Sequence, residues 1–174
     1  MPYYVESGIT GSIKANSLYC CCGTSHQGHS GWSNQTDWGT WNGGTQRIEC
    51  APGSGINSIR TFVHTSFGCS DCGSGSQKDA VEVKFYTSSN GSGTPVAQVL
   101  YFHIGSILVS NNTVYPKSGF GAYKSIGWVP AQNCGTCYQG AHTHAATKLG
   151  GSRVAGLTGC GDPISCCGTN QFQW

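Results

Sequence analysis

Charged side chains are scarce in this chain. Lys, Arg, Asp and Glu make up 9% of its 174 residues, against about 25% in an ordinary soluble domain. The formal net charge of +2 is too small to indicate a nucleic acid or an anionic membrane surface as a partner. Ser, Thr, Asn and Gln supply the polar character instead. Together with 27 Gly residues, they favour a β-rich, turn-rich domain that faces an aqueous exterior.

Three other patterns are missing. No run reaches the ~18 apolar residues of a membrane span, and no long amphipathic helix is visible. The start of the chain, Met1-Pro2-Tyr3-Tyr4, lacks the pattern of a secretory signal peptide, so we expect either a removed leader or release by lysis or particle assembly. Without a linker or an internal repeat, we predict one domain, 1–174, with a core at about 26–150 and a Cys-rich tail at 151–174.

Cysteine, by contrast, is abundant, with 11 residues. Cytosolic proteins rarely carry so many unless they bind metal, and the odd total leaves at least one cysteine unpaired within the chain. The pairs Cys69/Cys72 and Cys134/Cys137 suit either disulfides or a structural zinc site with four cysteine ligands. The 61 residues between the pairs far exceed the roughly 15–20 of a compact zinc ribbon. We favour disulfides, because the composition suits an oxidising exterior.

Short β-type segments follow one another along the chain. Residues 80–86 alternate apolar and charged side chains, which is typical of a half-buried strand. Gly-rich turns separate the segments, and residues 39–55 and 150–174 resemble loops most strongly. We therefore predict a mainly β fold, a single antiparallel β-sheet domain with Gly-rich loops and cysteine staples. The expected strands include 56–64, 80–86, 95–104, 107–109, 113–115 and 124–129.

His142 and His144 are one residue apart. On a β-strand they lie on the same side, because side chains alternate between faces. One can then bind a metal ion while the other reaches a group held by that ion. Such a pair alone is weak support for a metal site, because many pairs of this kind are two polar residues on a solvated strand face.

The order of motifs over residues 81–146 resembles the lysostaphin-type zinc metallopeptidases, which are peptidoglycan endopeptidases built on a small antiparallel β-fold. That family has a strand with Tyr-x-His-(Leu/Ile), a short apolar strand, a Val after a turn, an Ile-Gly-x-Val segment and a His-x-His strand. The matching segments here are Tyr101-Phe102-His103-Ile104, Ile107-Leu108-Val109, Val114, Ile126-Gly127-Trp128-Val129 and His142-Thr143-His144.

The N-terminal half carries less of this resemblance. The family has a His and an Asp, usually four residues apart, with an aromatic residue after the Asp. Asp37-Trp38 fits the second part, and His29 lies eight residues before Asp37. We take His29 as the matching histidine and His26 as its alternative. Ala145 and Ala146 stand where the family usually has Phe and an acidic residue, and the many cysteines are not typical of it.

The resemblance implies a Zn²⁺ ion held by His29, Asp37 and His144. It places His103 and His142 beside the zinc-bound water, which is the nucleophile, and beside the developing oxyanion. Two neutral histidines and one carboxylate leave a net charge of about +1, which lowers the pKa of the water towards ~7. Histidine suits proton transfer at neutral pH. The implied activity is hydrolysis of peptide cross-links in bacterial peptidoglycan by a secreted or phage-associated enzyme.

Two alternatives stay open. The chain can be a non-catalytic structural or binding protein on the same scaffold, such as a virion or cell-surface component stabilised by disulfides. It can also be a small domain held by a zinc ion with four cysteine ligands. In both cases His103 is an ordinary half-buried strand histidine and Asp37 a turn residue. Metal binding separates the hypotheses, because the enzyme depends on His144 and the four-cysteine site depends on Cys134.

Overall fold

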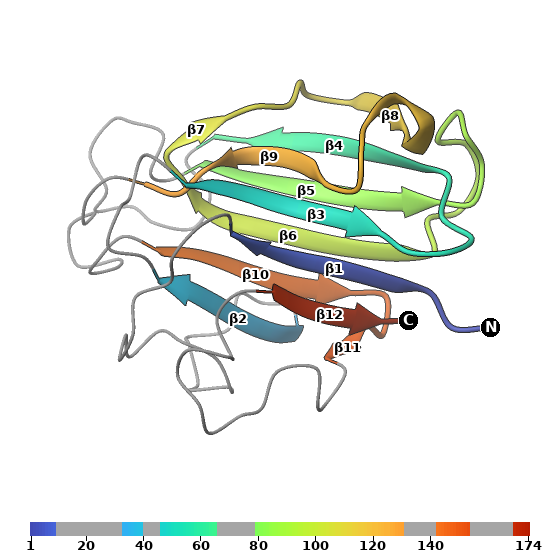
Figure 1. Ribbon diagram of the computed structural model, residues 1–174, viewed down its shortest axis with the longest axis horizontal. Helices are drawn as coiled ribbons and strands as arrows, with labels where there is room; N and C mark the ends of the chain where they lie inside the picture. The colour runs from blue at the N-terminus through green and yellow to red at the C-terminus, as the bar shows by residue number, and fades with distance from the viewer. Residues whose placement is uncertain (10–32, 40–45, 66–78, 131–141, 154–168) are drawn as a thin grey trace.

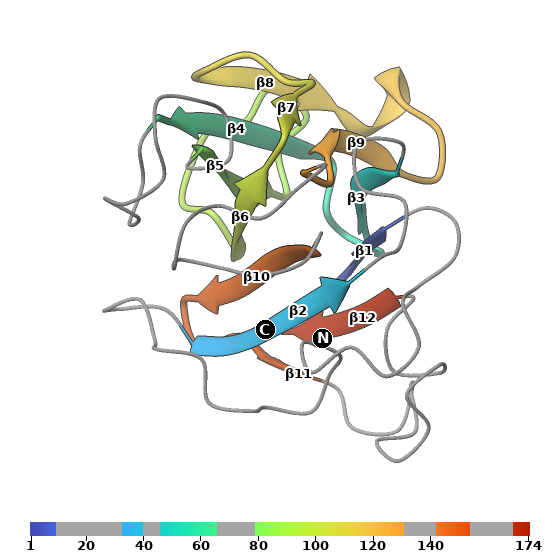
Figure 2. The same cartoon turned by 90° about the vertical axis from the view of Figure 1, so that its left-hand side faces the viewer.

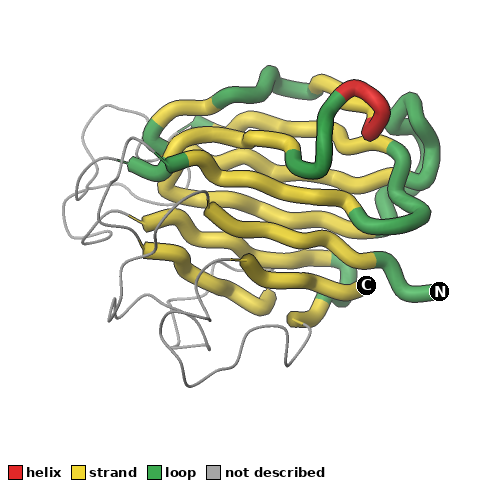
Figure 3. Tube along the Cα trace, viewed as in Figure 1, coloured by secondary structure: helices red, strands yellow, loops and turns green. Residues whose placement is uncertain are grey.

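In the part of the chain that the structure describes, nearly all regular secondary structure is β-strand (Figure 3). The computed structural model describes residues 1–9, 33–39, 46–65, 79–130, 142–153 and 169–174. All strand pairs in these ranges are antiparallel. The one helical element among them is a short 3-10 helix, η2 (Lys117–Gly119). No helix in the described ranges is long and apolar enough to cross a membrane.

The strands form two six-stranded sheets (Figure 1). In order across the first sheet they are β11 (Ser152–Arg153), β12 (Thr169–Gln173), β1 (Tyr4–Ile9), β3 (Arg47–Pro52), β9 (Lys124–Trp128) and β7 (Ser106–Ile107). In order across the second sheet they are β2 (Ser33–Gly39), β10 (His142–Lys148), β6 (Ala97–Ile104), β5 (Asp79–Tyr86), β4 (Ser58–His64) and β8 (Thr113–Pro116).

The prediction of a mainly β, antiparallel fold is confirmed, and the strands form two sheets. The two sheets stack face to face as a sandwich (Figure 2). A sheet with one apolar face must bury that face against another layer, and here each sheet covers the other. Two strands of the first sheet, β3 and β12, are not expected from the sequence, because both lie in regions whose composition resembles loops.

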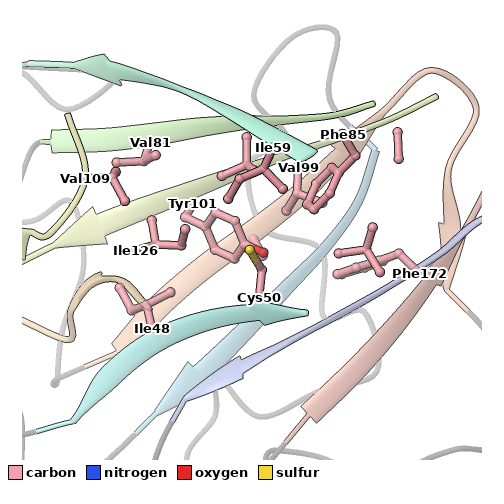
Figure 4. Packing of buried hydrophobic residues seen from close by; sticks show 14 of the residues in the cluster. Ile48, Cys50, Ile59, Val81, Phe85, Val99, Tyr101, Val109, Ile126 and Phe172 are labelled. Atoms are coloured by element: carbon pink, nitrogen blue, oxygen red, sulfur yellow. The ribbon is translucent and has the colours of Figure 1, made fainter. Parts of the chain in front are cut away.

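The core lies between the two sheets (Figure 4). Both sheets contribute fully buried side chains, and among the largest are Tyr101 and Phe85 from the second sheet and Phe172 and Ile48 from the first. The Tyr101 hydroxyl lies 2.5 Å from the Ser7 hydroxyl oxygen, so a hydrogen bond joins the two layers inside the core. This bond satisfies two polar groups that would otherwise be costly to bury.

Cys50 is a free, buried thiol that lies next to Tyr101 (Figure 4). Burial raises its pKa from 9.0 to about 12, and a hydrogen bond with Tyr101 partly opposes this effect. Burial also raises the pKa of Tyr101 well above its usual 10.0. The ten other cysteines, with both Cys-x-x-Cys pairs, lie outside the described residues. The expected disulfides and the alternative of a four-cysteine zinc site therefore stay predictions.

Candidate active site

Strand β10 carries the His-x-His motif and lies between β2 and β6 in the second sheet. Its His144 is directly opposite Asp37 of β2 on one side and Phe102 of β6 on the other. His142 is opposite Gly39. The register thus places two of the three expected zinc ligands at facing positions on neighbouring strands, although they are far apart in sequence. The third expected ligand, His29, and its alternative, His26, lie outside the described residues.

A β-bulge in β6 positions His103. Asp79 of β5 is opposite Ile104, whereas Val81 is opposite Tyr101, so two residues of β6 oppose one residue of β5. Tyr101 and Ile104 both belong to the core between the sheets. With strict alternation, residues three positions apart would face opposite sides. The extra residue of the bulge therefore places both Phe102 and His103 on the outer face of the second sheet.

The backbone of His103 is left-handed, with φ of 54°. Few residues other than glycine adopt this conformation, and histidine is among those that tolerate it best. A strained backbone of this kind occurs often at functional sites. At His103 it turns the imidazole towards β10, where it meets His144.

The rings of His103 and His144 lie close together on the outer face, with centroids 6.3 Å apart and an interplanar angle of 68°. The ring of Phe102 is 5.2 Å from that of His144, at 66°, and supports one side of it. His144 is 3% exposed, whereas His103 is half-buried. One imidazole is thus enclosed and the other reaches solvent.

The geometry fits part of the expected zinc site. Directly opposed positions in an antiparallel pair have their Cβ atoms about 4.5–5.5 Å apart on one face. At this separation a His and an Asp can share a metal ion with bonds of about 2 Å. For Asp37 and His142, however, the structure describes the backbone only. Among the described residues no group of three potential ligands is assembled, and the expected set needs His29 to be complete.

A separate polar network lies on the same outer face. The Glu82 carboxylate accepts a hydrogen bond of 2.6 Å from the Gln98 amide. It also lies 3.3 Å from the Lys84 ammonium and 3.3 Å from Nε2 of His64. The alternation of residues 80–86 predicts that Glu82 and Lys84 share a face. It does not predict the contact with His64, because that contact depends on the pairing of β4 with β5.

The structure therefore brings together His103, His144 and the backbone position of Asp37. It places the backbone of His142 two positions before His144 on the same strand. No protein-family model, curated protein or solved structure matches this chain. The resemblance to the lysostaphin-type peptidases accordingly rests on the sequence motifs.

Proposed function

We propose that the protein is a zinc-dependent endopeptidase of the lysostaphin type, which cleaves peptide cross-links of bacterial peptidoglycan outside the producing cell or from a phage particle. One observation supports this most strongly. The motifs assign Asp37, His103 and His144 to one site, and these residues lie on three adjacent strands: the rings of His103 and His144 lie close together, and the backbone of Asp37 pairs with that of His144. The bulge puts His103 on the same face as His144 while Tyr101 and Ile104 on either side both stay in the core.

In this proposal His29, Asp37 and His144 hold the zinc ion. When bound, zinc supplies a Lewis acid and lowers the pKa of a coordinated water. Phe102 limits rotation of the His144 ring, because the two rings are in edge contact. The enclosed position of His144 suits a ligand, whereas the more exposed His103 suits a group that meets substrate.

His103 and His142 are then the proton-transfer groups. The side chain of His103 can donate a hydrogen bond to an oxyanion that develops on the substrate carbonyl, or exchange a proton with the leaving amine. An imidazole ordinarily has a pKa near ~6.5, which suits either role at neutral pH. His142 is two residues before His144 and shares its face, so it supplies the second such group.

The strand arrangement also suits a peptide substrate. In the described ranges β2 pairs with β10 alone, so β2 is an edge strand of the second sheet. An extended peptide can pair with such an edge strand through main-chain hydrogen bonds and so add a strand to the sheet. Asp37 lies within β2, so a peptide bound there would pass close to the proposed zinc site.

Digestion of purified peptidoglycan tests the proposal. We expect the zinc-loaded protein to release new amino termini, a chelator to stop the release and added Zn²⁺ to restore it. His103→Ala should lower the rate by about 100-fold or more, the usual contribution of a proton-transfer group. His64→Ala is the matched control, because it removes an imidazole from the same sheet and should leave the rate unchanged.

Two results would argue for the non-catalytic alternative. One is the absence of hydrolysis by the zinc-loaded protein on peptidoglycans with several kinds of cross-link. The other is hydrolysis that is equally fast in His103→Ala, since the outer face of the second sheet would then not be the site of reaction.

A further inference from the structure

The Phe102 carbonyl has an unusual hydrogen-bond partner. The Thr143 hydroxyl donates to it over 2.8 Å, in a buried position between β10 and β6. The paired register of β10 with β6 begins at His144 and Phe102, so the bond joins the residue before the first pair to a member of that pair. The bond therefore adds a side-chain contact on the β10 side of β6, opposite the side on which the bulge faces β5.

The bond between Thr143 and the Phe102 carbonyl bears on the backbone conformation of His103. The Phe102 carbonyl belongs to the peptide that directly precedes His103, whose φ is 54°. Fixing that carbonyl restrains the peptide plane on one side of the N–Cα bond about which φ of His103 is defined. Thr143 itself lies between His142 and His144 and is 0% exposed. One residue thus connects the His-x-His strand to the bulge that carries the other histidine.

We propose that Thr143 is a positioning residue, whose hydroxyl holds the Phe102 carbonyl and thereby keeps the His103 ring beside His144. It does not touch substrate or metal. Its effect on hydrolysis rests on the proposed function, whereas its effect on the His103 backbone does not. The chemistry requires a hydroxyl at position 143, and a methyl group of the same shape cannot replace it.

The test compares the wild type with Thr143→Val by NMR on the full chain. The ¹³Cα and ¹³Cβ shifts of His103 report the sign of φ. We expect left-handed values in the wild type and extended values in Thr143→Val. Thr147→Val is the matched control, because Thr147 is equally buried on β10 and its hydroxyl donates to the Gly151 carbonyl over 3.1 Å. This control should leave the shifts of His103 unchanged.

Thr143→Ser and Thr143→Ala form a second pair, which keeps the proposal testable if the Val variant does not fold. Both lack the methyl group, and Ser alone keeps the hydroxyl. We expect wild-type shifts of His103 in the Ser variant and altered shifts in the Ala variant. Identical shifts in Ser and Ala, or wild-type shifts in a folded Val variant, would overturn the proposal.

Catalysis supplies a separate readout. With the zinc content unchanged, kcat should fall about tenfold or more in Thr143→Val, because small misplacements of a reacting group are costly, and Thr143→Ser should restore most of it. If the wild type neither binds zinc nor hydrolyses peptidoglycan, the proposed function fails and the NMR comparison still decides the role of Thr143.

Discussion

At the scale of single residues, His103 combines a strained backbone with a central place in the proposed site. A left-handed conformation costs a residue with a Cβ atom about 1 kcal/mol or more, and glycine avoids this cost. We therefore expect His103→Gly to be more stable than His103→Ala by about 1 kcal/mol in urea unfolding. Equal stabilities, or a more stable Ala variant, would show that φ at this position is not positive.

The buried thiol of Cys50 leads to a prediction about alkaline pH. Its pKa rises from 9.0 to about 12 on burial, so the folded protein keeps the proton that the unfolded chain releases. This stability is fully present below pH 9 and is lost as the pH rises towards 12. At ~1.4 kcal/mol per pH unit, the loss amounts to about 2 kcal/mol near a pH of about 10.5.

Urea midpoints measured near pH ~8 and near pH ~10.5 check this loss. The midpoint of Cys50→Ala should fall less between these pH values than that of the wild type, although the variant starts lower because it leaves a cavity. Tyr101 has a raised pKa as well and adds to the alkaline decline of both proteins. An equal decline in the two proteins would contradict a buried, protonated Cys50.

The sequence predicts the histidines of the site but not how they meet. The Tyr-x-His motif identifies His103, and the His-x-His motif identifies His144. The bulge that turns His103 towards β10 depends on the register between β5 and β6, and register is a property of two strands taken together, which no single motif contains. The contact of Thr143 with the Phe102 carbonyl has the same origin and could not be predicted from either motif.

At the scale of strands, Gly127 explains why β9 can pass so close to β6 and β7. A Cβ atom at this position would collide with Cγ2 of Ile104 and lie 2.7 Å from the Ser106 carbonyl oxygen. Gly127→Ala should therefore lower the stability by about 1–3 kcal/mol, the usual cost of overpacking. Ile104 follows His103 directly, so the signals of His103 should shift as well.

Gly121→Ala is the control for this substitution. No atom lies within 4 Å of a Cβ placed at Gly121, and the urea midpoint should stay the same or rise slightly. If Gly127→Ala unfolds at the same urea concentration as Gly121→Ala, this result contradicts the close packing of β9 against β6 and β7.

Periodicity predicts strands well where one face is apolar. Strands β4, β5, β6 and β9 lie close to their expected ranges, because β-branched and aromatic residues recur along them. β3 is not predicted, since Ile48 and Cys50 are its inward residues within a Gly-rich region. β12 is not predicted either, because it has one large apolar residue, Phe172, and forms through its pairing with β1. Without these two strands, the first sheet could not be predicted.

At the scale of the whole molecule, the cysteines bear on the stability of the entire chain. Cys50 is free and buried, which matches the expectation that an odd total leaves a cysteine unpaired. If the other ten form disulfides, a thiol reagent should find almost no thiol in the folded protein and about one per chain after unfolding without reductant. Several thiols per chain, released together with zinc, would instead support a zinc site with four cysteine ligands.

In the proposed function, one face of the second sheet holds zinc through His144, and the zinc content per chain reports this directly. Elemental analysis of protein purified without chelator should find about one zinc ion per chain in the wild type. His144→Ala should lose the ion, and the control His64→Ala should keep it. Zinc that survives His144→Ala, or a wild type without zinc, would contradict the claim.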